Sequence, residues 1–332
     1  MKNLRLAMIG CGHNANSHAV AFRAAGYDIT TVCARPESPR IQAFADQHNI
    51  PSTYDAVSDL LDDRSKWDGL LICVPVKDTI NVLTQALSID APILVEKPVG
   101  YRSADLLPFT NRELPVIVGY NRRYYRTTEE AKNEVERAAP FIGQMVFPQS
   151  IRVPDQLSDD PGYLEWFYAS VTAHGLDMAR YIFGELQIEA TSRLRNAAGI
   201  LLGIASTFST PNGSLIQFTA NLEASSNFSI TLDWPGRRFE LKPLEYATVY
   251  EGLEVHGPTA GRSISAYAPK VSRTINLDDV DLEYNPGYVR QAETFAGLIR
   301  GEGSGRAARL EDAYAALVLA EKLAGETYPP QQ

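Results

Sequence analysis

The start of the sequence constrains the fold more than any other part of the chain. An apolar run at residues 4–9 leads directly into Gly10-Cys11-Gly12-His13-Asn14-Ala15, and residues 14–25 then have the character of a helix that ends at Gly26. This spacing matches the G-x-G-x-x-A turn, in which one glycine permits a tight turn and the next lets backbone approach a pyrophosphate. The N-terminus of the helix supplies N–H donors and a positive dipole. The pattern predicts a dinucleotide-binding turn, and the alternative is a plain strand-to-helix connection.

Length and composition narrow the class of protein. The chain has 332 residues, 45 % of them hydrophobic and 21 % charged, which predicts a folded chain with two domains. Its net charge of −9 argues against a nucleic-acid or anionic-membrane partner. Three cysteines without a paired spacing indicate a reducing compartment, here the cytoplasm. The apolar runs are too short to cross a bilayer, and the start of the chain lacks a signal-peptide cleavage site.

Through residues 1–120, short apolar runs alternate with helical segments. Near-continuous apolar strands between helices predict a parallel sheet covered on both faces, which is a doubly wound α/β Rossmann domain. The expected strands are residues 4–9, 29–33, 69–74, 92–95 and 115–118, and residues 39–48 form a further expected helix.

The pattern changes in residues 121–332, where runs with a period of two predict an α+β domain. We expect a largely antiparallel or mixed open sheet, and Pro211-Asn212-Gly213 predicts a hairpin within it. Helices are expected at residues 127–138, at about 168–183, and at 288–300 and 309–323, where the last two are free to pack back on the first domain. The expected strands are residues 144–153, 186–195, 201–209, 214–222 and 228–233.

The end of the second strand indicates which cofactor is preferred. NAD-binding sites usually carry an acidic residue there for the ribose hydroxyls, but this chain has Ala34 followed by Arg35. A guanidinium suits a 2′-phosphate, and Ser38 and Arg40 offer further donors, so NADP is favoured over NAD. The alternative is that Arg35 stacks on the adenine and tolerates either cofactor.

Three motifs together carry a resemblance that spans the whole chain. Glu96-Lys97-Pro98-Val99-Gly100, with Met8-Ile9-Gly10-Cys11-Gly12 before it and Val118-Gly119-Tyr120-Asn121-Arg122-Arg123 after it, resembles the glucose–fructose oxidoreductase / inositol dehydrogenase / MocA (Gfo/Idh/MocA) family. The resemblance is looser in the second half, where Ile142-Gly143-Gln144 and residues 174–184 match best. It implies that Lys97 lies beside the nicotinamide and the substrate hydroxyl, and that the Lys97–Pro98 peptide bond is cis.

The chemistry of Lys97 supports the same role. A lysine at the carboxyl edge of a parallel sheet lies where ligands bind in such folds. Burial near an oxidised nicotinamide is expected to lower its pKa below about 10.4 and so permit proton transfer. Glu96 either orients the ammonium group or closes the cofactor pocket. The alternative role for Lys97 is to anchor a turn or a phosphate.

A second acid–base residue is expected on the helix near residue 174. His174 and Asp177 share one helix face, and members of the resembled family carry a similar His-x-x-Asp with the histidine facing the lysine. Asp177 then holds His174 or contacts the substrate, and plain packing is the alternative. Relatives such as inositol dehydrogenase place an aspartate where this chain has Ser170, which shifts the expected substrate class. The chain also departs from the family after the fourth strand, where it has Val76 and Thr79.

The remaining predicted contacts lie around the presumed cleft. The polar and aromatic segment after Gly119 suits a polyhydroxylated or anionic substrate, whereas a charged hinge is the alternative. No metal is expected, because the histidines lack a metal-like spacing with carboxylates or cysteines. The predicted cofactor contacts are Gly10, Gly12, His13, Asn14, Ala15, Ala34, Arg35, Ser38, Arg40, Val74, Pro75, Glu96, Lys97 and Asn121, and the predicted substrate contacts are Tyr120, Arg122, Arg123, Trp166, Ser170 and Asp177.

These features predict an NAD(P)-dependent oxidoreductase that interconverts a secondary alcohol and a ketone. The resemblance implies a sugar, nucleotide sugar or polyol as substrate, and a homodimer or homotetramer assembled through the exposed face of the second sheet. Two other functions stay open. One is a cofactor-sensing regulatory protein without turnover, and the other is a glycosidase that uses bound NAD for transient oxidation.

Overall fold

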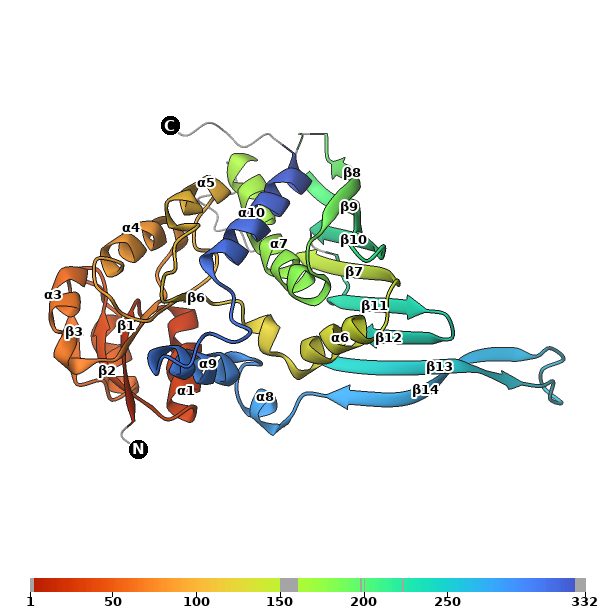
Figure 1. Ribbon diagram of the computed structural model, residues 1–332, viewed down its shortest axis with the longest axis horizontal. Coiled ribbons are helices and arrows are strands. Elements are labelled where there is room, and N and C mark those ends of the chain that lie inside the picture. The colour runs from red at the N-terminus through yellow and green to blue at the C-terminus, as the bar shows by residue number, and fades with distance from the viewer. Residues whose placement is uncertain (1–2, 150–160, 198, 200, 223, 326–332) are drawn as a thin grey trace. The chain divides into compact units, whose positions relative to one another are not determined.

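The computed structural model describes residues 3–149, 161–197, 199, 201–222 and 224–325, without the side chains of 149 and 161–171. The chain forms two compact units (Figure 1). Unit 1 comprises Met1–Tyr124 and Asp279–Glu321, and unit 2 comprises Tyr125–Asp278 and the remaining C-terminal residues. Residues 279–321, which the sequence analysis grouped with the second half, therefore share a unit with the first 124 residues.

Unit 1 is built on a six-stranded parallel sheet, as the alternating apolar runs predicted. Its strand order is β3-β2-β1-β4-β5-β6, the order of a doubly wound fold whose two halves diverge between β1 and β4. The three-residue strand β3 was not predicted, because Ser-Thr-Tyr carries no apolar pattern. The strands are β1 (Leu4–Ile9), β2 (Tyr27–Cys33), β3 (Ser52–Tyr54), β4 (Gly69–Ile72), β5 (Ile93–Val95) and β6 (Val116–Val118).

Helices cover this sheet, and those within residues 279–324 come from the far end of the sequence. Helix α1 (His13–Ala24) ends at Gly26 with φ +83°, as expected for a left-handed terminator, and packs against α9 (Tyr288–Ile299). The rings of Phe22 and Phe295 meet edge to face at 6.0 Å. The other helices of the unit are α2 (Ile41–Gln47), α3 (Val57–Asp62), α4 (Val76–Ala86), α5 (Ser103–Leu106), α8 (Asp279–Glu283), α10 (Leu310–Ala324, down to Glu321) and the short 3₁₀ turns η1 (Arg64–Lys66), η2 (Leu107–Phe109) and η3 (Asn121–Tyr124).

Unit 2 contains an eight-stranded mixed sheet in the order β14-β13-β12-β11-β7-β10-β9-β8. Among the described strand pairs of this second sheet, only β7–β10 is parallel. The predicted hairpin is confirmed, because β9 and β10 pair antiparallel around Gly213, whose φ is +84°. The strands are β7 (Ile142–Gln149), β8 (Gln187–Arg195), β9 (Leu201–Ser209), β10 (Leu215–Leu222), β11 (Ser229–Trp234), β12 (Arg237–Leu241), β13 (Tyr246–His256) and β14 (Ala266–Asn276).

Two helices of unit 2 pack on this sheet, α6 (Arg126–Arg137) and α7 (Pro161–Phe183). The expected start of α7 near residue 168 was wrong, since the helix begins at Pro161, whose fixed φ suits a first helical turn. The expected strand end at residues 150–153 lies outside the described residues. Among the residues that the structure describes, no helix is long and apolar enough to span a membrane.

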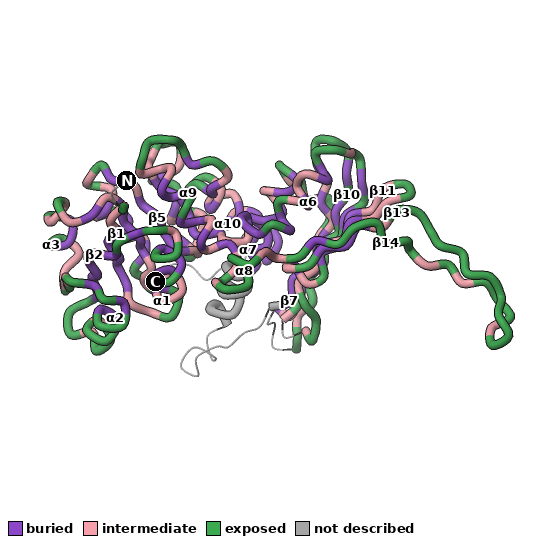
Figure 2. Tube along the Cα trace, turned by 90° about the horizontal axis from the view of Figure 1, so that it is seen from below, coloured by how far each residue is buried: buried purple, intermediate pink, exposed green. Residues whose placement is uncertain are grey.

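Strands β13 and β14 continue beyond the sheet as a two-stranded ribbon, which Figure 2 shows as an exposed extension of unit 2. β13 lies between β12 and β14 as far as Glu251, and beyond that residue it pairs with β14 alone. Both faces of the ribbon are exposed, and the sequence analysis assigned no strand to its residues.

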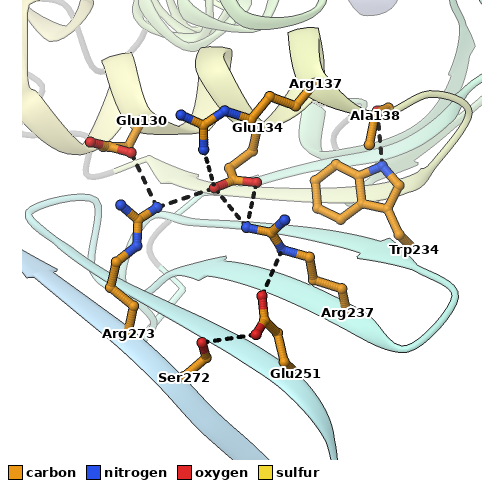
Figure 3. A network of polar contacts seen from close by, with 9 residues as sticks. All are labelled: Glu130, Glu134, Arg137, Ala138, Trp234, Arg237, Glu251, Ser272 and Arg273. Carbon is orange, nitrogen blue, oxygen red and sulfur yellow. Dashed lines mark hydrogen bonds and ion pairs between the residues drawn. The ribbon is translucent and has the colours of Figure 1, made fainter.

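A charge network around the buried Glu134 holds the base of the ribbon (Figure 3). Glu134 of α6 is 1 % exposed and pairs with Arg237 of β12 at 2.8 Å and with Arg273 of β14 at 3.2 Å. Arg137 approaches the same carboxylate at 3.6 Å. A buried carboxylate needs such partners, and it ties α6 to both strands.

Candidate active site

The first turn of unit 1 has the geometry that the glycine spacing predicted. Gly10 has φ +108°, and a Cβ on it would lie 2.0 Å from the carbonyl oxygen of Cys73. Its N–H donates to Cys33 O at 2.8 Å, so the turn is wedged between the ends of β2 and β4. Gly12 caps α1, and a Cβ on it would meet no described atom within 4 Å. The backbone at Gly12 is therefore open to a ligand, as a phosphate-binding turn requires.

A cavity of about 690 Å³ opens at this turn, at the carboxyl ends of β1, β2 and β4. Its volume is within the usual range for small-molecule and cofactor sites. Ala15 lies beneath it in the core, fully buried, where it lets α1 pack closely. Of the predicted cofactor residues, the cavity is lined by Gly10, Gly12, His13, Asn14, Ala34, Arg35, Ser38, Arg40, Val74 and Pro75.

The cavity also contains polar residues that the sequence analysis did not assign, namely Asp55, Lys77, Asp78, Asn81 and Gln85. Asp55 directly follows β3 and lines the cavity together with Arg35. An acidic side chain therefore stands in the same pocket as the guanidinium that favoured NADP. Recognising Asp55 required knowing that β3 is a strand, and its three residues carry no such signal.

Lys97 lies directly after β5, in the Glu96-Lys97-Pro98 segment. The Lys97–Pro98 peptide bond is cis, as the resemblance implied. Lys97 is half-buried, and burial lowers its pKa from the ordinary value, which was expected of a residue that transfers protons. The negative charge of Glu96 raises the pKa of Lys97 in opposition, and the positive charge of Arg122 lowers it further.

Glu96 is buried and bonded on both carboxylate oxygens. One oxygen lies 2.6 Å from His18 Nε2, and the other accepts the backbone N–H of Lys97 at 2.9 Å. The sequence analysis gave His18 no role. It lies three residues after Ala15 on α1, so it shares the face of that helix that packs on the sheet.

The segment after β6 mixes buried and half-buried side chains. Tyr120 is 2 % exposed, and Arg123 is 5 % exposed and pairs with Asp312 at 3.3 Å. The Asn121 side chain donates to Pro286 O at 3.0 Å, whereas Arg122 is half-buried. These contacts show that Asn121 and Arg123 hold unit 1 together. Substrate or cofactor binding by this segment stays a prediction.

His174 and Asp177 are both buried on α7, with 6 % and 1 % exposed. The helix sits close to β7 there, because a Cβ on Gly175 would lie 2.6 Å from the Phe147 ring. The side chains of Trp166 and Ser170 lie outside the described part of the structure. Lys97 belongs to unit 1 and His174 to unit 2, so their predicted meeting across a cleft stays a prediction.

The three cysteines are free thiols. Burial raises the pKa of Cys33 to about 12 and also raises that of Cys73, so neither thiol is primed as a nucleophile. In the described residues, no cluster of three or more histidine, cysteine or acidic side chains has an arrangement that would hold a metal ion.

A comparison with protein families identifies the fold. The model of an oxidoreductase family with an NAD-binding Rossmann fold matches residues 4–114. This match supports the resemblance of the chain to the Gfo/Idh/MocA oxidoreductase family. The match covers strands β1 to β5 and the cavity of unit 1, which are the features that the opening turn predicted.

The curated relatives of this chain are distant in sequence. Myo-inositol 2-dehydrogenase of Thermotoga maritima is 23 % identical over 192 residues, which span 55 % of this chain and 55 % of that enzyme. D-apiose dehydrogenase of Paraburkholderia graminis is 25 % identical over 212 residues, 59 % of this chain and 55 % of that enzyme. The chain therefore matches about half the length of these relatives.

A solved structure shares the fold over nearly the whole chain. An oxidoreductase from Agrobacterium radiobacter, in complex with NAD+, L-tartaric acid and magnesium, superposes with a TM-score of 0.74. It is 19 % identical, and the match covers 97 % of this chain and 96 % of that one. At this identity the likeness establishes the fold of both units.

Proposed function

We propose that this protein is an NAD(P)-dependent oxidoreductase that interconverts a secondary alcohol and a ketone on a sugar, nucleotide sugar or polyol. The observation that carries the proposal is Lys97, a half-buried lysine with a lowered pKa on the sheet whose neighbouring strand ends form the dinucleotide cavity. The relatives named for inositol and apiose support a polyhydroxylated substrate. The free thiols fit the cytoplasmic location expected from the sequence.

In this proposal each side chain has a chemical task. The bound nicotinamide exchanges a hydride with the carbinol carbon of the substrate. Neutral Lys97 accepts the hydroxyl proton during oxidation and returns it during reduction. His174, with Asp177 one turn further along α7, orients the hydroxyl or shares in the proton transfer. The other proposed substrate contacts are Tyr120, Arg122, Arg123, Trp166 and Ser170, and Ser170 is a neutral serine where the resembled family has a carboxylate.

The proposed function is tested by identifying the cofactor in the purified protein by mass spectrometry and then screening polyols, aldoses and nucleotide sugars. NAD+ and NADP+ are each supplied, and the absorbance of the reduced nicotinamide is followed. We expect turnover with at least one substrate. A firmly held cofactor that no substrate reduces or oxidises would argue for the sensing alternative.

The preferred cofactor is proposed to be NADP, with NAD as the alternative. We expect Arg35→Ala to weaken NADP+ binding by about 10- to 150-fold and NAD+ binding far less, because a charge-assisted contact to the 2′-phosphate contributes about 1.5–3 kcal/mol. Fluorescence titration of each reduced cofactor measures the effect. Asp55→Ala is the matched comparison. It should strengthen NADP+ binding relative to NAD+ binding, because it removes a negative charge from the same pocket. Equal losses for both cofactors in Arg35→Ala would overturn the assignment.

We infer that the protein is a homodimer or homotetramer and that the β13–β14 ribbon contributes to the contact. Leu253 pairs with Pro269 and Val255 with Tyr267, so four exposed apolar side chains share one ribbon face. A lone two-stranded ribbon is marginally stable in water. Pro269 and Lys270 on the edge strand β14 oppose edge-to-edge pairing, which favours contact through the face. An uncharged apolar face is complementary to itself, so a second copy fits it.

The double variant Leu253→Ser/Tyr267→Ser is expected to shift the protein towards smaller species in sedimentation velocity. Each buried large side chain contributes about 1.5–3 kcal/mol, and a two-fold contact loses each contribution twice, so the dissociation constant should rise by at least about 10⁴-fold. Leu282→Ser is the control, because Leu282 is 71 % exposed but belongs to α8 of unit 1 and is not part of the ribbon. An unchanged sedimentation profile of the double variant would exclude the ribbon from the contact.

A further inference from the structure

A buried histidine–carboxylate pair, His18 and Glu96, contacts the backbone of Lys97. His18 of α1 is 1 % exposed, and its Nε2 lies 2.6 Å from Glu96 Oε1. A carboxylate only accepts hydrogen bonds, so Nε2 is the donor. The second oxygen, Oε2, accepts the N–H of Lys97 at 2.9 Å. The carboxylate of Glu96 therefore links a side chain of α1 to the backbone of Lys97.

The surroundings are shaped to hold this pair. A Cβ on Gly119, at the end of β6, would lie 3.0 Å from Cδ and Oε1 of Glu96, so this glycine leaves the space that the carboxylate occupies. On the other side, the ring of Tyr288 lies 4.7 Å from that of His18. The Asn285 side chain donates to Ser17 Oγ at 2.8 Å. The segment around α9 thus holds the part of α1 that carries His18.

The charge of Glu96 matters for Lys97. Burial lowers the pKa of Lys97, as does the charge of Arg122, whereas Glu96 raises it. The same charge raises the pKa of the neighbouring Cys73 thiol, which burial already raises. The ring of Tyr288 contacts the ring of His18 in the His18–Glu96 pair. The place of one carboxylate therefore affects how readily Lys97 gives up its proton.

We propose that His18 is a positioning residue for proton transfer by Lys97, because it holds the Glu96 carboxylate against the Lys97 peptide. The backbone of Lys97 is then held in one position, and its side chain experiences one fixed negative charge. Since α1 also forms the phosphate turn at its N-terminus, the same helix positions both the cofactor and the lysine. The inference rests on the proposed role of Lys97 as the proton acceptor.

The test replaces His18 and follows Lys97 by two measurements. One is the pH dependence of kcat for the best substrate from the screen, and the other is the pH dependence of Lys97 acetylation by acetic anhydride without substrate. In His18→Phe, which keeps the ring but not the hydrogen bond, we expect the pKa of Lys97 to fall by about one unit in both measurements. We also expect kcat to fall by about tenfold with little change in KM, because the lysine is less well placed.

Companion variants separate this role from general damage. His18→Gln retains an N–H donor near the place of Nε2 and should behave like the unchanged protein. His18→Asn has a shorter amide that does not reach Glu96, so it should behave like His18→Phe and serves if the phenylalanine disturbs folding. Glu96→Gln should also lower the pKa of Lys97, as His18→Phe does, because it removes the negative charge. His48→Phe is the matched control, because His48 is also buried, contacts a ring (Phe44, at 4.6 Å) and bonds Asn16 at 2.8 Å.

Two results would overturn the inference. One is an acetylation profile of Lys97 that is unchanged in both His18→Phe and His18→Asn. The other is the same shift in His48→Phe. A shifted acetylation profile in a protein that turns over no sugar or polyol would support the positioning role of His18 and count against the proposed function.

Discussion

Lys97→Ala is expected to lower kcat by about 10²–10⁴ while folding and cofactor affinity stay nearly intact. The physical reason is that a half-buried amine with a lowered pKa is the group proposed to take the hydroxyl proton, and alanine offers none. Lys97→Arg should not restore turnover, because a guanidinium stays protonated and does not act as a base. Steady-state kinetics with the best substrate, together with cofactor titration, measure both effects. Lys132→Ala, which removes a lysine that pairs with Glu136 on α6, is the control.

Two outcomes would change the role of Lys97. A loss of cofactor affinity without a separate loss in kcat would assign Lys97 to anchoring the cofactor. Unchanged turnover would remove it from the chemistry altogether and favour a protein that senses the cofactor without catalysis.

Gly10→Ala is expected to damage both stability and cofactor binding. The backbone at Gly10 has φ +108°, and the new Cβ would lie 2.0 Å from the Cys73 carbonyl, which is backbone that has little freedom to move. We expect the free energy of unfolding to fall by at least about 3 kcal/mol, with cofactor affinity reduced more than about 100-fold. Urea unfolding and titration with reduced cofactor measure the two losses.

The neighbouring glycine provides the matched comparison. Gly12 has φ −85°, and a Cβ on it would meet no described atom within 4 Å, so Gly12→Ala should leave the free energy of unfolding nearly unchanged. It should still weaken cofactor binding, because the methyl group occupies the space through which a pyrophosphate approaches. A stable Gly10→Ala would contradict the close packing at Cys73, and full cofactor affinity in Gly12→Ala would contradict the phosphate-binding role of the turn.

The sequence by itself determined the features that local chain geometry specifies. Gly10 and Gly12 specified the turn, since few residues other than glycine tolerate a left-handed backbone or open it to a ligand. Apolar runs specified the parallel sheet, because strands buried on both faces have to be apolar throughout. Asn212-Gly213 specified the β9–β10 hairpin for the same conformational reason. The Glu96-Lys97-Pro98 motif located the lysine and its cis peptide bond through family resemblance.

Only the tertiary structure decided which distant segments meet. His18 and Glu96 are 78 residues apart, and each is unremarkable in its own segment, so their contact has no local signal. The same holds for Asp55, which enters the cavity from a three-residue strand. The sequence analysis left the last two helices free to pack back on the first domain, but the contact of α9 with α1 came only from the tertiary structure. The β13–β14 ribbon was also missed. Its apolar side chains alternate only over short stretches and lie exposed rather than in a core, so the pairing of the two strands became visible only in the tertiary structure.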